Sequence, residues 1–214
     1  MQVSPCPHSY TRYRCPGGVL TELKKRICIV NPSCAEAGTD SNTPATIRMF
    51  LQQAVDHYPR LAAFSFTVLL PYRENAVGYR SLLLRFHTEV WQRTGEYSRN
   101  RQQARRHSPP TVLRWIWESA SAPVCRMVLL MNPDTLGMIR DAPPAASVLQ
   151  GMSMIITDAG RAVTDADGGI TGMSLFIISR AERGGFTQSF NLLQARVQEM
   201  ASPVAMTRTG VICP

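Results

Sequence analysis

The chain has 214 residues, a formal net charge of +8 and a hydrophobic fraction of 44%. This length is enough for one sizeable domain whose core needs no disulfides, and the composition is typical of a globular protein. No apolar run reaches the roughly 18 residues of a membrane span, and the opening MQVSPCPHSY lacks the charged start and apolar segment of a signal peptide. We therefore expect a cytoplasmic protein.

The basic residues are almost all arginines, because Lys24 and Lys25 are the two lysines among 23 basic side chains. The planar guanidinium group of arginine suits bidentate contacts with phosphates and carboxylates. This excess of positive charge predicts a nucleic-acid or acidic-protein partner, and the alternative is a basic surface that contacts only solvent.

The cysteine spacing argues against a metal site. Intervals of 8, 12 and 5 residues separate the first four cysteines, whereas a zinc site normally takes two ligands from one tight turn, and His8 beside Cys6 does not supply that pattern. We therefore expect free thiols, no metal and no cofactor. The six cysteines are Cys6, Cys15, Cys28, Cys34, Cys125 and Cys213.

Residues 1–43 have the composition of a weakly structured extension, with ICIV at 27–30 as a possible edge strand. A helix is then predicted to begin with Thr43 as its N-cap and Pro44 at its first position, and to end at Pro59. Alternation in RLAAFSFTVLL predicts a strand. The apolar residues on one face of that strand are Ala62, Phe64, Phe66, Val68 and Leu70.

A second amphipathic helix is predicted after the Arg-Glu-Asn turn, with an apolar stripe from Tyr79 to Val90. The chain then becomes polar and basic over QRTGEYSRNRQQARRHSPP, which is either a fraying extension of this helix or a mobile loop. The basic side chains of this run are Arg93, Arg99, Arg101, Arg105, Arg106 and His107.

Two further strands, TVLRWIWES and VCRMVLLM, are predicted to pair as a hairpin, and a third helix begins near Ala145. TDADGGITG reads as a loop, MSLFIIS as a strand, and a last helix begins near Phe186. This order predicts an α+β fold, an antiparallel sheet with helices packed on one face. One domain is expected over residues 44–202, between the extension 1–43 and a tail over 203–214.

Four pieces of the chain, in order, resemble the YagK/YfjJ family, the inovirus-type replication proteins of prophages and related mobile elements. The pieces are VDHYPR before the first strand, LRWIWES, PVCRMVLLMN and GGFTQSFNLLQAR. The resemblance extends from about residue 47 to residue 200. It implies the ferredoxin-like or RRM-like core of the HUH endonucleases of rolling-circle replication.

In HUH enzymes a His-x-His pair on a central strand holds a divalent metal that polarises the scissile phosphate, and a tyrosine on a later helix attacks the phosphorus. The resemblance places the two histidine positions at Val124 and Arg126 and the tyrosine position at Phe190. Valine and arginine cannot ligate a metal, and phenylalanine has no hydroxyl group. The resemblance therefore implies a member that has lost its catalytic residues.

Two roles for Arg126 stay open at the level of sequence. Its fixed positive charge could hold a backbone phosphate without cutting it, or its role could be structural, with the side chain snorkelling from the strand end or pairing with Glu118 across the hairpin. Arg114, on the neighbouring strand, is a further candidate for contacts with nucleic acid or an acidic partner.

Other features have competing interpretations. The run from Arg93 to Arg106 is predicted to bind a phosphate backbone or an acidic protein, although charge runs are often only solvated faces. Trp115 and Trp117 are more typical of a core than of base-stacking platforms. His57 and His87 lie on predicted helices without a carboxylate partner at fixed spacing, which indicates structural roles.

We expect a catalytically inactive relative of a replication initiator, carried by a prophage or phage satellite. Its predicted partner is a phage or host protein that handles DNA, such as a replication or packaging component, and possibly DNA as well. The alternatives are a regulator that acts on nucleic acid alone and, less favoured, an active nickase that uses another tyrosine.

Overall fold

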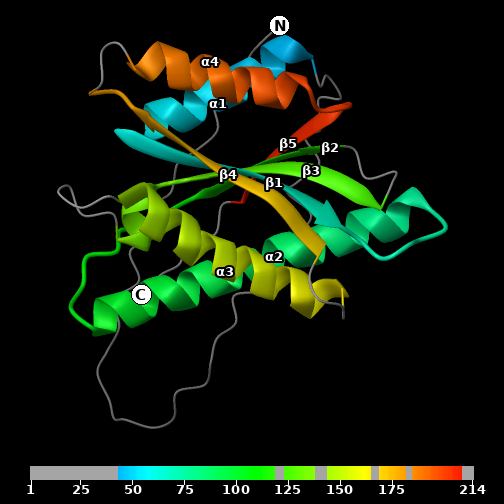
Figure 1. Cartoon of the computed structure of the whole chain (residues 1–214), viewed down its shortest axis with the longest axis horizontal. Helices are drawn as coiled ribbons and strands as arrows, with labels where there is room; N and C mark the ends of the chain where they lie inside the picture. Colours follow the sequence, from blue (N-terminus) through cyan, green and yellow to red (C-terminus); the bar gives the residue numbers. More distant parts are fainter. Residues whose placement is uncertain (1–42, 119–122, 138–143, 165–168, 182–184, 209–214) are drawn as a thin grey trace, which may run out of the picture. The chain divides into compact units, whose positions relative to one another are not determined.

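Five antiparallel strands form one sheet in the order β4-β1-β3-β2-β5. The computed structural model of the protein describes residues 43–118, 123–137, 144–164, 169–181 and 185–208. Figure 1 shows β3 near the middle of the sheet, between β1 and β2. The strands are β1 (Arg60–Leu69), β2 (Leu113–Glu118), β3 (Val124–Met131), β4 (Gly169–Ser179) and β5 (Pro203–Arg208).

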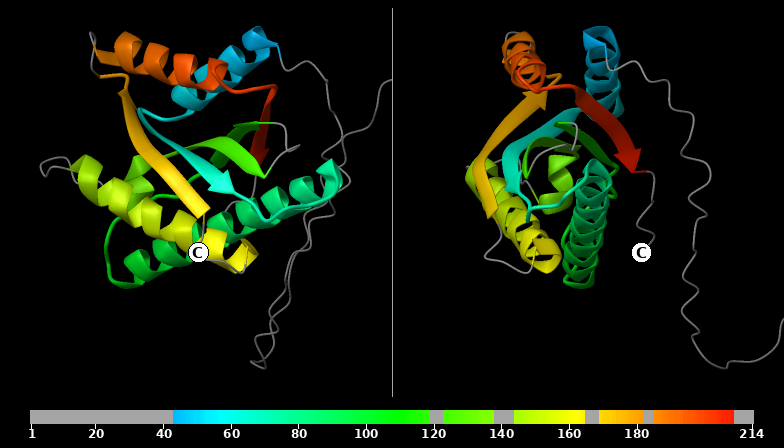
Figure 2. Two further views of the ribbon diagram at one scale, coloured as in Figure 1. Left: turned by 45° about the vertical axis from the view of Figure 1, so that its right-hand side comes forward. Right: turned by 90° about the vertical axis from the view of Figure 1, so that its right-hand side faces the viewer.

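Within the described residues, helices cover both faces of this sheet: α1 and α4 lie on one face, and α2 and α3 lie on the other (Figures 1 and 2). The expectation of helices on one face was therefore wrong. The reason is visible in β1, where Ala62 and Phe64 are buried toward α2 and α3 while Leu61 and Ala63 are buried toward α1 and α4. The helices are α1 (Pro44–His57), α2 (Ala76–Gln103), α3 (Pro144–Thr164) and α4 (Gly185–Gln198), with a short 3₁₀ helix, η2 (Pro133–Leu136).

Local capping explains where two of the helices begin. The hydroxyl group of Thr43 accepts a hydrogen bond from the amide of Thr46 at 3.3 Å, and Pro44 occupies the first turn, as the sequence predicts. The side-chain oxygen of Asn75 accepts from the amide of Gly78 at 2.8 Å and so begins α2.

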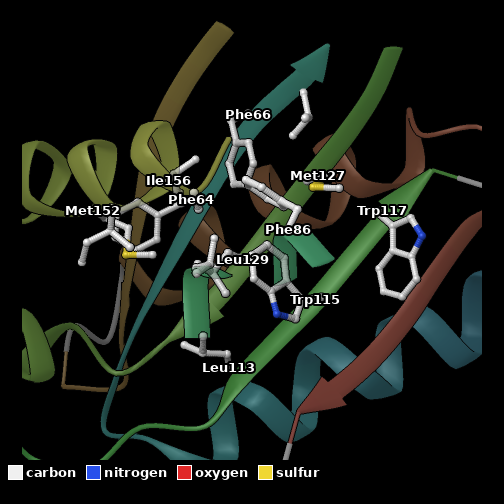
Figure 3. Packing of buried hydrophobic residues seen from close by; sticks show 14 of the residues in the cluster. Phe64, Phe66, Phe86, Leu113, Trp115, Trp117, Met127, Leu129, Met152 and Ile156 are labelled. Carbon is white, nitrogen blue, oxygen red and sulfur yellow. The ribbon is translucent and has the colours of Figure 1, made fainter. Parts of the chain in front are cut away.

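The core between the sheet and the helices α2 and α3 contains the largest buried side chains (Figure 3). Trp115 is fully buried and Trp117 is 8% exposed, and both lie in this cluster. Their assignment to the core is confirmed, which leaves neither ring available as a surface platform for bases.

The predicted hairpin of β2 and β3 is confirmed, and β3 also pairs with β1 along its whole length. Most of the basic run that begins at Arg93 is helical, because α2 continues as a regular helix to Gln103. The helix ends there as Ala104 leaves the helical conformation and Arg105 adopts a φ of 55°.

Two strand assignments differ from the sequence interpretation. β4 begins at Gly169, inside the segment read as a loop, because its backbone pairs with the end of β1, and Gly172 adopts a φ of 64° at the bulge in that pairing. Residues read as part of the tail form β5, which pairs with β2 from Glu118↔Pro203 to Leu113↔Arg208.

All described residues belong to one unit, Asp40–Pro214. The predicted extension 1–43 and its candidate strand ICIV lie outside the described residues, apart from Thr43, as do positions 209–214 of the predicted tail. Among the helices that the structure describes, none is long and apolar enough to cross a membrane.

Candidate functional site

The start of β3 holds Val124 and Arg126, the two positions at which the resemblance to HUH enzymes would place the metal-binding histidines. Side chains alternate along a strand, and Cys125 and Met127 belong to the core beneath α2 and α3. Val124 and Arg126 therefore lie on the opposite side, the one covered by α1 and α4. Val124 is 52% exposed.

The guanidinium group of Arg126 is held by groups of the protein itself. Its Nε donates to Oε1 of Glu118 at 2.7 Å, and its Nη2 donates to the backbone carbonyl of Glu199 at 2.7 Å. The Arg126 amide also donates to Oε2 of Glu118 at 3.2 Å, and the Ala201 amide donates to Oε1 at 3.0 Å. This ion pair joins the β2–β3 hairpin to the connection between α4 and β5, and it confirms the pairing of Arg126 with Glu118.

The charges of this pair stabilise each other. Burial alone would raise the pKa of Glu118, whose side chain is 14% exposed, but the hydrogen bonds from Arg126 and from the Ala201 amide outweigh burial and hold the pKa below its ordinary value. The hydrogen bond to Glu118 raises the pKa of Arg126. The positive charge of Arg126 is therefore largely compensated within the fold.

Phe190 lies on α4, above the same sheet face, as a core residue. It is 6% exposed and stacks on Phe186 with ring centroids 5.9 Å apart. Arg126 contacts the backbone carbonyl of Glu199, just after the end of α4 and nine residues beyond Phe190, which is roughly 13.5 Å at the rise of an α-helix. Positions 126 and 190 thus share a face of the sheet without meeting.

Cys125 is a buried free thiol beside this pair. Burial, together with the negative charge of Glu118, raises the pKa of Cys125 to about 12. Since the thiolate is the reactive form, this cysteine is inert near neutral pH.

The C-terminal end of α2 brings the predicted basic run together, but its arginines differ in their surroundings. Arg93 pairs with Glu89 at 3.4 Å, and Arg101 donates to the His107 carbonyl at 3.4 Å while its guanidinium lies over the Tyr97 ring. Three arginines of the run are exposed and form no ion pair with any described residue: Arg99, Arg105 and Arg106.

Hydrogen bonds hold the segment that follows α2, so these arginines project from an ordered surface. Ser108 is buried, and its hydroxyl group hydrogen-bonds to Ser98 of α2 at 2.9 Å and donates to the Thr135 carbonyl of η2 at 2.7 Å. Gln102 donates to the Ser108 carbonyl at 2.9 Å.

Arg114 lies on β2, on the side of the sheet covered by α1, with its guanidinium over the ring of Phe50 at 5.8 Å. Its exposure is intermediate. The structure therefore separates Arg114 from the run at the end of α2.

The two histidines have different environments. His57 is exposed at the end of α1, with its ring edge-on to Tyr58. His87 is fully buried and stacks on Trp115 with centroids 4.2 Å apart, and neither ring nitrogen has a hydrogen-bond partner within the described structure. Burial, assisted by the charge of Arg208, lowers the pKa of His87 to about 3, so the ring is neutral.

One surface escaped the sequence interpretation. The outer side of α2 carries a shallow hollow of about 350 Å³, which is lined by the exposed apolar residues Val77 and Leu84 and by Arg80 and Arg85. Its signal in the sequence is a second set of helix positions outside the buried stripe, which is weaker than the periodicity of the buried residues.

Comparison with known proteins returned one family. The family model described as "Uncharacterised conserved protein UCP030791" matches residues 36–169, which include α1, β1, α2, the β2–β3 hairpin and α3. Neither a curated protein nor a solved structure matches the chain significantly.

Proposed function

Because the chain belongs to this family, whose description names no activity, we propose from its own residues that it is a catalytically silent relative of rolling-circle replication initiators. In this proposal the protein comes from a prophage or phage satellite, and it uses the initiator scaffold to bind a phage or host DNA-handling protein, such as a replication or packaging component.

The order of elements supports the proposed ancestry. The segment from β1 to β4 runs β-α-β-β-α-β, and its strands lie in the order β4-β1-β3-β2. This is the connectivity of the ferredoxin-like arrangement. Positions 124 and 126 lie at the start of β3, the middle strand of the sheet, and α4 covers the sheet face on which they lie; this placement supports the proposed relationship to HUH enzymes.

The observation that carries the proposal is that the guanidinium group of Arg126 is hydrogen-bonded to groups of the protein itself. A metal-dependent nuclease needs electron-pair donors at this place, whereas Arg126 offers only donors of hydrogen bonds, and Glu118 and the Glu199 carbonyl occupy them. The adjacent position is the aliphatic Val124. The side chains at this site thus fit a structural role better than they fit phosphoryl transfer.

DNA binding is the second candidate, and the exposed arginines at the end of α2 favour it. Arg99, Arg105 and Arg106 are free to meet phosphates, as no described carboxylate neutralises them. Contacts of this kind position a protein on nucleic acid without reading its sequence.

The first test is for strand cleavage. We expect no covalent protein–DNA adduct when the protein is incubated with labelled single-stranded origin DNA and Mn²⁺ or Mg²⁺, because the positions of both metal ligands and of the nucleophile carry residues without that chemistry. A wild-type adduct that survives denaturation would overturn the silent assignment.

The second test separates the two partners. The tagged protein is recovered from infected and uninfected cells, with and without nuclease treatment. Partners that survive nuclease and then bind as purified proteins support the protein-binding proposal. Partners lost on nuclease treatment, together with binding to purified DNA, would favour the DNA alternative.

A further inference from the structure

The outer side of α2 carries a straight stripe of four residues, Val77, Ser81, Leu84 and Thr88, spaced by 4, 3 and 4 positions. Helix residues at this spacing lie on one line along the helix surface. Val77 is 75% exposed and Leu84 is 41% exposed, so the stripe faces away from the core. We call these four residues the α2 seam.

Arginine side chains border the seam. Arg80 and Arg85 line the hollow of about 350 Å³ together with the seam residues. Arg208 of β5 closes one end, since its Nη1 donates to the Thr88 hydroxyl group at 3.0 Å and its guanidinium lies over Trp91 at 5.5 Å. The seam is therefore a shallow, open hollow in which Val77 and Leu84 alternate with Ser81 and Thr88, and arginines lie along its borders.

This pattern matches one side of a helix pair. In a heptad notation with Val77 and Leu84 at d and Ser81 at a, Arg80 falls at g and Arg85 at e. These flanking positions select partners by charge. Neither arginine forms an ion pair with a described residue, so both remain available to carboxylates of another helix.

We propose that the α2 seam binds an acidic amphipathic helix of a partner protein. Apolar residues of that helix pack on Val77 and Leu84, and its flanking Asp or Glu residues pair with Arg80 and Arg85. The inference rests on the proposed function, because it names the class of partner that the binding role requires.

The charges and the apolar residues of the seam argue against two other occupants. A second copy of this chain, packed seam to seam, would bring Arg80 and Arg85 against the same arginines, and like charges across a helix pair are destabilising. A nucleic-acid backbone would satisfy the arginines but would cover Val77 and Leu84 with polar groups, which gives no apolar contact.

The test uses the full chain and two designed peptides of about three heptads with Leu at a and d. One peptide carries Glu at e and g, and the other carries Lys there. Fluorescence anisotropy measures affinity, and methyl NMR spectra locate the contact at Val77 and Leu84. We expect the Glu peptide to bind at least tenfold more tightly than the Lys peptide.

Charge reversal supplies the decisive comparison. The variant R80E/R85E should lose at least tenfold in affinity for the Glu peptide and gain affinity for the Lys peptide. Both sites are exposed in the first half of α2, where acidic residues do not oppose the helix dipole, so folding should persist. The variant R48E/R180E changes the net charge equally at exposed arginines elsewhere and should bind like the wild type.

The variant Leu84→Asp tests the apolar contact independently and should also weaken the Glu peptide at least tenfold. Equal affinity for both peptides, or no methyl shifts at Val77 and Leu84, would overturn the inference. So would concentration-dependent dimerisation abolished by Leu84→Asp, or oligonucleotide binding lost in R80E/R85E but kept in Leu84→Asp.

The outcome is separable from that of the proposed function. A covalent DNA adduct would end the silent assignment while leaving the peptide result in place. Failure of the Glu peptide would end the seam inference while leaving the nuclease comparison in place.

Discussion

At the scale of single residues, Arg126 shows how a fold accommodates a charge at the start of a central strand. A charge at the start of a central strand is costly unless it is paired, and Glu118 with the Glu199 carbonyl supplies that pairing. The pair also links β2 and β3 to the connection between α4 and β5, so its contribution is to the stability of the fold.

Removing the carboxylate should therefore weaken the fold. We expect Glu118→Ala to lower the free energy of unfolding by about 1–2 kcal/mol, since Arg126 and the Ala201 amide lose their acceptor while Arg126 remains partly solvated. Urea unfolding at pH 7 measures this. The control Glu199→Ala keeps the backbone carbonyl that Arg126 contacts and removes an exposed carboxylate, which pairs with Arg196 and adds only the smallest contribution to the raised pKa of Arg126; it should change stability little.

The same pair sets a pH dependence with a defined sign. Because the pKa of Glu118 is lowered on folding, its contribution is present above the ordinary carboxyl range and is lost as the pH falls through the folded-state pKa. The stability difference between wild type and Glu118→Ala should shrink in acid. An equal difference at pH 7 and pH 3 would contradict this account.

His87 is a second residue whose environment predicts a measurable effect. Its pKa falls on folding from 6.5 to about 3, so the unfolded chain binds the proton more readily, and stability should decrease as the pH falls below 6.5. We expect His87→Leu to raise stability by about 1 kcal/mol at pH 7, because two unpaired ring nitrogens leave the core.

The check is a comparison of urea midpoints at pH 7.5 and 5.5. The wild type should lose about 1 kcal/mol more than His87→Leu over this interval, since one pH unit corresponds to at most 1.36 kcal/mol per proton. Parallel losses in both proteins would show that His87 is not the titrating group.

At the scale of elements, α2 is the longest helix in the described part of the chain, and its length separates two surfaces. The seam lies in its first half, and the exposed arginines lie at its C-terminal end. Arg101 lies near the exposed arginines but packs into the structure. Its guanidinium group lies against Gly137, where an added Cβ would be 2.0 Å from Nη2. Arg101 therefore stabilises the C-terminal end of α2, and its guanidinium group is not one of the free charges there.

This distinction defines the variant that tests the C-terminal surface. Replacing Arg99, Arg105 and Arg106 by alanine, with Arg101 retained, should change stability by less than ~1 kcal/mol. If DNA is the partner, three lost phosphate contacts should reduce the slope of log affinity against log salt by about 2.7. If a protein is the partner, the loss should fall mainly on its association rate.

The readouts are binding to duplex and single-stranded DNA between 50 and 200 mM salt, and stopped-flow association with any purified partner. Three phosphate contacts correspond to about a fortyfold change in affinity over that range. Unchanged binding of all partners by a folded variant would show that the run is only a solvated face.

At the scale of the whole molecule, the sequence predicts the elements that carry their own local signals. Thr43 and Pro44 mark the start of α1, and the alternation in β1 and in the hairpin predicts strands that the structure confirms. β5 was missed because its six residues are all half-buried at a sheet edge, and such a strand lacks the contrast between faces on which alternation depends. The hydrogen bond from Arg126 to the Glu199 carbonyl joins residues 73 positions apart, so no local sequence pattern could predict it.

The order of strands in the sheet has a consequence for how the protein is made. β1 pairs with β4, and the paired residues are 100 to 119 positions apart in the chain. At ribosomal rates of roughly 5–20 residues per second, β1 waits about 5–20 s for this neighbour. Its other neighbour, β3, lies 55 to 69 positions further along the chain. In the first part of that interval, before β3 is made, the apolar run from Leu61 to Leu70 has no strand to pair with, which makes it a natural binding site for chaperones on the nascent chain.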